Sequence, residues 1–214
     1  MLIAENIVEL QDERTRAWHH QASAACDSPS AAGEWLQAVC RQHRANFDLW
    51  HIEDEARAPG ATDADLAEVK RRVDTTNQLR NDLAEALDGA LLEWLKPQGL
   101  PNPAAPLNSE SPGLIIDRQS ILALKIYHTR EEAERTGAPQ GHAVRNRDRL
   151  AILEAQRTDL AGCLDCLWRE TLAGSRQFKL YRQMKMYNDP SLNPAVYGRS
   201  QVRQPGRQNQ ESSS

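Results

Sequence analysis

The stretch that decides the fold class runs from Ala64 to Leu95 and reads ADLAEVKRRVDTTNQLRNDLAEALDGALLEWL. It contains no proline, and its apolar residues recur at the spacing of a helix in which each residue turns ~100°. Thr62 or Asp63 can cap its first turn, and Pro97 ends it. A helix of this length, with almost no strand pattern elsewhere in the chain, predicts an all-α architecture.

Outward from this helix, the same periodicity predicts four more long helices, over residues 3–25, 31–57, 117–135 and 144–172, and a short one over 178–187. Only Leu114–Ile116 reads as a strand-like run. The proline-rich segment 97–116 is interpreted as a lid or a packed surface loop, and Asp117 as the cap of the helix that follows. We therefore predict one helical bundle domain over 1–197 and a disordered polar tail over 198–214.

Composition narrows the class of protein. The 214 residues include 26 Lys and Arg and 30 Asp and Glu, for a formal net charge of −4, and 40% are hydrophobic, which is typical of a globular chain and excludes extended disorder. No apolar run approaches the ~18 residues of a membrane span, and no basic start with an apolar stretch follows Met1. We therefore expect a cytoplasmic protein without a membrane partner.

In that compartment the four cysteines, Cys26, Cys40, Cys163 and Cys166, are expected to be reduced, partly buried thiols. The spacing of Cys163 and Cys166 resembles a redox or zinc pair, but both lie inside a predicted helix with no strand before it. Packing is therefore the preferred interpretation of these thiols.

Polar residues occupy the buried side of the helix predicted over 31–57. Taking Trp35 as the centre of that side, four polar side chains fall on it: His43, Asn46, Asp54 and Arg57. They indicate a satisfied internal network, a helix end that emerges into solvent, or a ligand site. In a ligand site, His51 at the border of this side and Asp54 three residues on could share a proton or contribute metal ligands.

The helix over 64–95 carries a polar stripe along one direction: Lys70, Asp74, Asn77, Asn81, Glu85 and Asp88. The default interpretation is a solvated face opposite Leu79, Leu83, Leu87 and Trp94. Asparagine is a poor helix former, however, so Asn77 and Asn81 one turn apart favour a functional role. Arg80 borders the apolar side, where its guanidinium can make a two-pronged bond to a carboxylate or phosphate.

Two further groups of polar residues, one on the helix over 117–135 and one near the C-terminus, allow more than one interpretation. In the helix over 117–135, Lys125 and His128 share a face with Ile121, where a histidine is more often a packed core residue and a lysine often extends into solvent. Near the C-terminus, basic residues recur every three positions with tyrosines between them: Arg176, Lys179, Tyr181, Arg182, Lys185 and Tyr187. This segment is suited to a protein partner, an anion or the chain's own acidic helices, and the negative net charge disfavours nucleic acid.

Four strings of the chain together resemble a known family: Asn46–Arg57 (NFDLWHIEDEAR), Asn77–Asp82 (NQLRND), Leu124–His128 (LKIYH) and Lys185–Pro194 (KMYNDPSLNP). It is a bacterial helical family known as a domain of unknown function, and the resemblance spans residues 3–195. It implies a helical fold and a bacterial cytoplasmic origin, and it implies no established activity, cofactor or active site.

The strings fall on the residues that the helical directions single out, which favours a pocket between the second, third and fourth helices for a small anionic ligand, such as a phosphorylated or nucleotide-sugar-like compound. Arg57, Arg80 and Lys125 would hold the anion, Asn77, Asn81 and His128 would complete the binding set, and His51 and Asp54 are the acid–base candidates. The segment 97–116 would cover the pocket.

Two alternatives accompany this prediction. A divalent metal on His51, Asp54, Asp74 and His128 is a variant of it, but no recognised metal-binding motif supports this set, and no metal or cofactor is assigned. The other alternative is a non-enzymatic adaptor, in which the polar cluster fixes the register of the helices and the basic C-terminal segment binds a protein.

Overall fold

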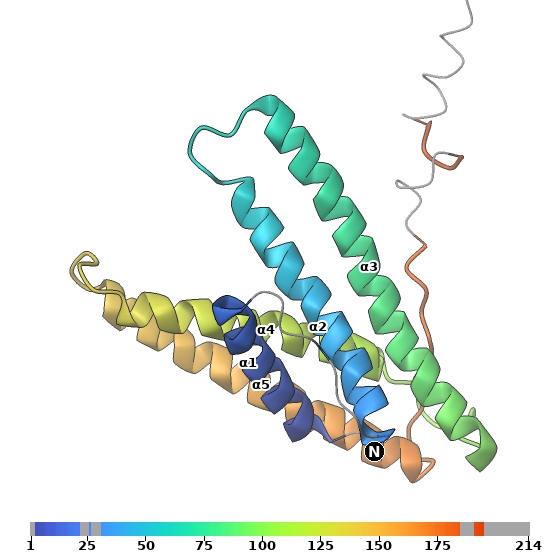
Figure 1. Ribbon diagram of the computed structural model, residues 1–214. Helices are drawn as coiled ribbons and strands as arrows, with labels where there is room; N and C mark the ends of the chain where they lie inside the picture. Colours follow the sequence, from blue (N-terminus) through green and yellow to red (C-terminus); the bar gives the residue numbers. More distant parts are fainter. Residues whose placement is uncertain (1–2, 22–25, 27–30, 185–190, 195–214) are drawn as a thin grey trace, which may run out of the picture. The chain divides into compact units, whose positions relative to one another are not determined.

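The computed structural model describes residues 3–21, 26, 31–184 and 191–194. It contains five α-helices, α1 (Ala4–His20), α2 (Ala31–Glu55), α3 (Asp63–Leu95), α4 (Pro112–Glu134) and α5 (His142–Leu172), and a short 3₁₀ helix at Lys96–Gln98 (Figure 1). The described part of the chain has no strand. The predicted all-α helical bundle is confirmed.

Helix α4 is the centre of the bundle. It contacts each of the other four α-helices, α2 and α3 form one antiparallel pair, and α4 and α5 form another (Figure 1). About half of the residues of α4 are buried, over most of its circumference, and Arg118 and Lys125 lie on its exposed side. A helix that is surrounded by neighbours has no single apolar face. The direction of a side chain on α4 therefore does not tell which neighbour it meets.

The apolar core consists of two clusters. The larger one gathers buried side chains from all five helices, with Ile7, Val39, Leu87, Ile116 and Trp168 among them. The smaller one contains Trp18, Cys40, Phe47 and Leu124, from α1, α2 and α4. Burying a large apolar side chain stabilises the fold by about 1.5–3 kcal/mol, so these clusters fix the helices on which the polar groups described below are mounted.

The polar stripe of α3 divides into two halves. Lys70 and Asp74 pair with each other on the exposed half, as a solvated face predicts. Further along, Asn81 and Asp88 are buried, whereas Trp94 from the supposed core side is 52% exposed. The solvated-face interpretation is therefore wrong for the second half of α3, because α4 packs against it there.

Asp88 of α3 binds the first turn of α4. Its carboxylate accepts hydrogen bonds from the Ser111 hydroxyl and from the Gly113 backbone N–H, the latter at 2.7 Å. Burial raises the pKa of Asp88 to about 6. A β-carbon on Gly113 would lie 2.3 Å from the carbonyl oxygen of Ala84, so only glycine permits this approach of the two helices.

Several predicted boundaries are corrected. Ser111 caps α4 and Pro112 is its first residue, so Leu114–Ile116 is helical and Asp117 is an interior residue instead of a cap. α1 ends at His20 and α2 at Glu55, earlier than predicted. Residues 178–184 are not helical, contrary to the predicted C-terminal helix, and 185–187 lie outside the described residues.

The segment before α4 is a packed surface loop, one of the two interpretations offered for it. Asn102 donates to the carbonyl oxygen of Gly174 at 3.0 Å, and the Asn108 N–H donates to that of Gln177 at 2.7 Å. These bonds attach the loop to the chain that follows α5. No hydrogen bond of the described loop residues connects it to the site described below.

The five helices lie within one compact unit, Met1–Tyr181, and the chain from Arg182 onward forms a second unit. The boundary predicted at residue 197 and the predicted tail over 198–214 lie outside the described residues. None of the described helices is long and apolar enough to cross a membrane.

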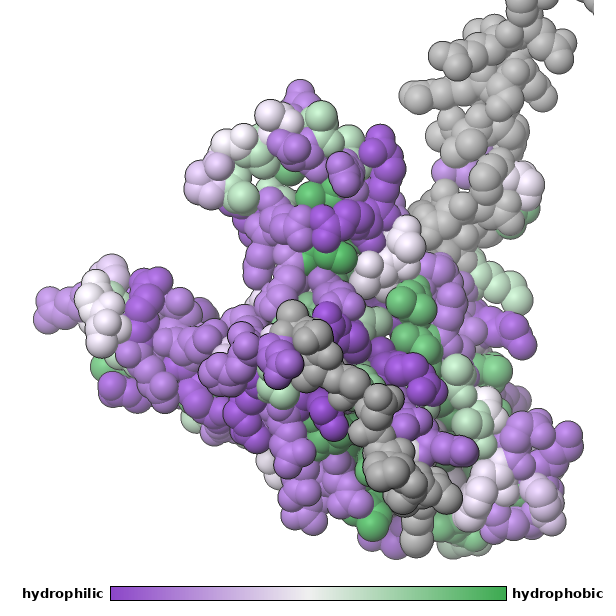
Figure 2. Space-filling model, in the orientation of Figure 1, coloured by the Kyte–Doolittle hydropathy of each residue, from purple (hydrophilic) through white to green (hydrophobic). Residues whose placement is uncertain are grey.

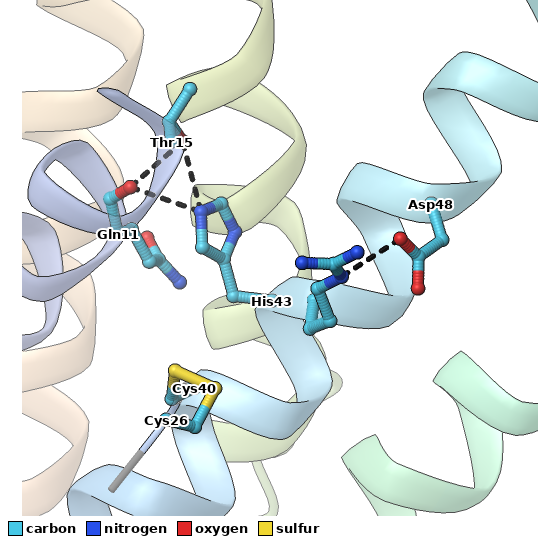
Figure 3. Close-up of a disulfide and its surroundings, with 7 residues drawn as sticks. Gln11, Thr15, Cys26, Cys40, His43 and Asp48 are labelled. Carbon is cyan, nitrogen blue, oxygen red and sulfur yellow. Dashed lines mark hydrogen bonds and ion pairs between the residues drawn. A yellow bond between two sulfur atoms is a disulfide. The ribbon is translucent and has the colours of Figure 1, made fainter. Parts of the chain in front are cut away.

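Cysteine chemistry differs from the expectation of four reduced thiols. Cys26 and Cys40 form a disulfide, with 5.8 Å between their α-carbons, next to the side chain of His43 (Figure 3). Cys163 and Cys166 are free thiols on α5, the former exposed. The Cys26–Cys40 bond ties the segment before α2 to the buried side of that helix.

Candidate functional site

A buried polar network lies where α2, α3 and α4 meet, and Asp117 is its centre. Oδ1 of Asp117 accepts hydrogen bonds from Gln42 Nε2 at 2.6 Å and from Asn46 Nδ2 at 2.9 Å. Its Oδ2 accepts from Arg80 Nη1 at 2.5 Å, which completes an ion pair. Asp117 is therefore held by partners from two neighbouring helices, and its charge is balanced by Arg80.

His43 extends the network to α1 (Figure 3). Its Nε2 lies 2.9 Å from both the Gln11 carbonyl oxygen and the Thr15 hydroxyl, and its Nδ1 lies 2.7 Å from the Ser120 hydroxyl. Since a carbonyl oxygen can only accept, Nε2 carries the proton and Nδ1 accepts from Ser120. Asn46 Nδ2 in turn donates to Ser120 Oγ at 2.9 Å.

Burial lowers the pKa of His43 to about 3, so the imidazole is neutral at pH 7. Both of its ring nitrogens have hydrogen-bond partners, and the ring is fully buried. The internal-network interpretation of the inward polar residues is thus confirmed for His43 and Asn46. Their hydrogen bonds specify how α1, α2 and α4 pack together, and they leave no lone pair on the ring for a ligand.

A hollow of about 450 Å³ lies beside this network, between α2, α3 and α4. It is lined by Asn46, Leu49, Trp50, Glu53, Asp54, Arg57, Arg80, Ile121 and Leu124. Apolar side chains form much of its lining, with two guanidinium groups and two carboxylates among them. Three of the predicted site residues, Asp54, Arg57 and Arg80, therefore share one hollow.

The guanidinium of Arg80 is held in place at this hollow. Its Nε donates to Asn77 Oδ1 at 2.8 Å and its Nη1 to Asp117, while its other terminal nitrogen has no hydrogen-bond partner among the described residues. Arg57 is more exposed and pairs with Glu53, with 3.2 Å between Nη1 and Oε2. Asn77 thus acts through Arg80, and Asn81 is buried on the same helix.

Three histidines from three helices converge next to the hollow: His19 of α1, His51 of α2 and His128 of α4. One ring nitrogen from each lies within 4.8 Å of the others. Aromatic rings pack against two of them: Tyr127 stacks on His19 with centroids 4.1 Å apart, and Trp50 stacks on His128 at 4.9 Å. We call His19, His51 and His128 the histidine cluster.

Hydrogen bonds fix the orientation of two of these rings. His19 Nδ1 donates to the Thr15 carbonyl oxygen at 2.7 Å, and His128 Nδ1 donates to Glu131 Oε2 at 3.0 Å. The Nε2 atoms of His19 and His128 are buried and have no hydrogen-bond partner among the described residues. Each ring therefore keeps one unshared lone pair.

Burial is the main reason that the pKa values of His51 and His128 are lowered. The neighbouring histidines lower the pKa of His51 further, and the charges of Asp54 and Asp48 oppose this. No hydrogen bond joins His51 to Asp54 among the described contacts. The two acid–base candidates are thus coupled by charge, with Asp54 in the hollow and His51 in the cluster.

Lys125 lies apart from the other predicted site residues. Its side chain is exposed and lines a different hollow, between α4 and α5, with Gln156 and Asp159. The expectation that Lys125 contributes to the pocket between α2, α3 and α4 is therefore not met. Asp74, part of the considered metal set, is paired with Lys70 and is not in the histidine cluster.

Sequence reasoning missed His19, Trp50, Asp117 and Glu131 as members of the site. A local signal existed for His19, because it follows the buried Thr15 by one helical turn and therefore continues the inward side of α1. For Glu131 the signal was its position three residues after His128, which is within side-chain reach on a helix.

Together these features define an all-α bundle protein with a hydrogen-bonded polar interior and a histidine cluster beside a lined hollow. The chain belongs to the family described as a protein of unknown function (DUF4254), whose model matches residues 36–180, from the first turns of α2 to beyond the end of α5. No curated protein and no solved structure matches the chain.

Proposed function

We propose that the hollow between α2, α3 and α4 binds a small anionic molecule, of the phosphorylated or nucleotide-sugar-like class. The observation that carries the proposal is the position of Arg80. Its guanidinium is held at the lining by Asn77 and Asp117, with one terminal nitrogen left over. A guanidinium that is already oriented loses little further freedom when it binds a phosphate or carboxylate.

The size and lining of the hollow support a small organic ligand. Its volume of about 450 Å³ lies within the range of roughly 300–1,000 Å³ that is common for such sites. Leu49, Trp50, Ile121 and Leu124 offer an apolar surface for a sugar or base, and Arg57 at the rim is a second cation for the anionic group. Asp54 is the acid–base candidate within reach of a molecule bound there.

The test is a thermal-shift survey of sugar phosphates and nucleotide sugars on the full chain, followed by calorimetry on any compound that raises the melting temperature. Loss of a charge-assisted hydrogen bond costs about 1.5–3 kcal/mol, so Arg80→Lys and Arg57→Ala should each weaken binding by about 10–100-fold. Lys125→Ala is the matched control, since it removes a cation from the separate hollow. A hit that all three variants bind as wild type does would contradict the proposal.

The compartment and origin proposed with this function are the bacterial cytoplasm. The Cys26–Cys40 disulfide weighs against this location, because disulfides are rare in that compartment. Alkylation of thiols at the moment of cell lysis, followed by mass spectrometry, measures the state in the cell. Four alkylated cysteines would support the cytoplasm, and a protected Cys26–Cys40 pair would favour an oxidising compartment.

One observation favours the adaptor as a second candidate. Lys179, Tyr181 and Arg182 of the basic segment are exposed, whereas Arg176 pairs with Glu170, and Lys185 and Tyr187 lie outside the described residues. For an adaptor, Lys179→Glu with Arg182→Glu should abolish capture of a partner protein while Arg80→Lys leaves capture unchanged. The opposite pattern would eliminate this candidate.

A further inference from the structure

We propose that His19, His51 and His128 form a binding site for one divalent transition-metal ion, with Zn²⁺ as the best-matched ion. The site is assembled from α1, α2 and α4, and one ring nitrogen of each histidine lies within 4.8 Å of the others. The inference stands independently of ligand binding at Arg80, because it rests on different side chains.

The unshared lone pairs are the first argument. In His19 and His128 the Nδ1 atom is used by the Thr15 carbonyl oxygen and by Glu131, and the buried Nε2 has no hydrogen-bond partner among the described residues. A buried acceptor without a partner costs free energy. A metal ion between the rings would supply the missing partner to both nitrogens at once.

The groups behind the rings are the second argument. Histidines that bind metals usually donate their other N–H to a carboxylate or a backbone carbonyl, which fixes the tautomer and the ring plane. Glu131 provides a carboxylate for His128, and Thr15 provides a carbonyl oxygen for His19. Both kinds of supporting partner are therefore in place.

The distances suit a small ion. Zinc binds histidine nitrogens at about 2.0–2.1 Å in tetrahedral geometry, which places two such nitrogens roughly 3.3 Å apart. From a separation of at most 4.8 Å, small rotations of the side chains reach this value. Imidazole is also a preferred ligand of Zn²⁺ and its transition-metal neighbours, whereas Mg²⁺ and Ca²⁺ prefer oxygen.

The surroundings suit a cation. Carboxylates of Asp54 and Asp48 act on His51, and Glu131 is bonded to His128, so a divalent ion would bring positive charge among negative groups. Aromatic rings of Tyr127 and Trp50 stack on two of the histidines and help to hold their ring planes. Three histidines leave a fourth tetrahedral position for water or for an oxygen of an anionic ligand.

The position of Trp50 relates the metal site to the hollow. Its ring stacks on His128, with 10° between the ring planes, and it also lines the hollow beside Arg80. Trp50 is therefore shared by the hollow and the metal site, and its fluorescence is a signal for a metal bound at His128.

The experiment titrates the untagged full chain with Zn²⁺ after dialysis against a chelator. Competition with a chromogenic chelator measures the affinity, and a second titration with Co²⁺ gives a visible spectrum that reports the ligands. The expected result is one saturable ion per chain, a raised melting temperature and a Co²⁺ spectrum of nitrogen ligation. His51→Ala and His128→Ala should each lower the affinity at least about 100-fold, and Glu131→Gln about 10–100-fold. His20→Ala is the control, because His20 is an exposed histidine next to His19 on α1, and it should leave the affinity unchanged.

Absence of saturable binding by the wild type, or His51→Ala and His128→Ala variants that bind Zn²⁺ as tightly as the wild type, would overturn the proposal. Circular dichroism verifies the fold of each variant, and His51→Gln or His128→Gln replaces an alanine variant that does not fold. Failure here is distinguishable from failure of the proposed function, since Arg57→Ala and Arg80→Lys leave all three histidines in place.

Discussion

His43 and the histidine cluster both lie among α1, α2 and α4, but their ring nitrogens differ in how many hydrogen-bond partners they have. Around His43, partners come from Gln11 and Thr15 of α1 and from Ser120 of α4, and both ring nitrogens are bonded. Gln11, His43 and Ser120 are each followed eight residues later by a member of the histidine cluster, and two of its three rings keep a buried nitrogen without a partner among the described residues.

The difference teaches that a polar residue inside a helical bundle does not by itself indicate function. In the His43 region the hydrogen-bonding capacity of the imidazole is used within the protein, so the group serves the packing of the helices. In the histidine cluster part of that capacity is left over, and a ligand can use it. Mutations should therefore reduce stability in the first region and binding in the second.

The largest loss of stability is expected from Asp117→Ala. It leaves Gln42, Asn46 and Arg80 without their shared acceptor, and breaking a largely buried ion pair of this kind costs about 3 kcal/mol. Urea denaturation of the variant measures the loss. Asp82→Ala is the control, an exposed carboxylate with one bond from Gln78, for which at most about 0.5 kcal/mol is expected. Equal losses of stability in Asp117→Ala and Asp82→Ala would contradict the stabilising role of the buried network.

His43→Gln should change the dependence of stability on pH. The pKa of His43 is about 3 in the folded state and 6.5 in the unfolded chain, so below pH 6.5 the unfolded chain binds the extra proton. Stability is then lost as the pH falls, by about 1.4 kcal/mol for each pH unit. The difference in unfolding free energy between wild type and variant should shrink by about 2 kcal/mol from pH 7 to pH 5. A constant difference would show that His43 is not buried as a neutral ring.

Asp88 provides the opposite control for this measurement. Its pKa is raised to about 6 from 3.8, so its contribution to stability is present at low pH and is lost as the pH rises through 6. In the wild type the two groups therefore offset each other between pH 6 and pH 4. The difference between wild type and Asp88→Asn should grow as the pH falls over this range, while that for His43→Gln shrinks.

His19→Ala should have a smaller effect on stability than Asp117→Ala, about 1–2 kcal/mol in the metal-free protein, because one hydrogen bond and four contacts with neighbouring rings are lost. The same variant should lose the rise in melting temperature that Zn²⁺ produces. Differential scanning calorimetry with and without Zn²⁺ measures both quantities. A large loss of stability without any loss of the zinc effect would assign His19 to the packing region.

The smallest effect is expected from Lys125→Ala. The side chain is exposed and has no ion pair among the described residues, so the free energy of unfolding should change by less than about 0.5 kcal/mol. Neither Zn²⁺ affinity nor ligand binding at Arg80 should change. A measurable loss of either would show that Lys125 belongs to the site between α2, α3 and α4.

Helical directions predicted much of this arrangement. Hydrophobic periodicity located five long helices, and the inward directions of His43 and Asn46 correctly indicated a polar interior on α2. The directions also placed Arg80 at the border of the apolar side of α3, where it pairs with Asp117 of α4. These successes share a physical basis, because a helix with one apolar side fixes which of its residues face the core.

The failures have an equally definite basis. Asp117 was taken for a cap, because the Ser111–Pro112 start of α4 was not recognised. Lys125 was assigned to the wrong hollow, because α4 packs against four helices and the direction of a side chain on it does not show which of them that side chain faces. His19 was missed as a member of the cluster, because its distance from His51 and His128 depends on the register between helices far apart in the sequence.

The close contact at Gly113 also determines where His128 lies at the other end of α4. Fifteen residues of continuous helix, roughly 22 Å, connect that contact with Ala84 to His128. A methyl group added at residue 113 would push the start of α4 away from α3. Because α4 is one continuous helix, this shift would also move the imidazole of His128 relative to those of His19 and His51.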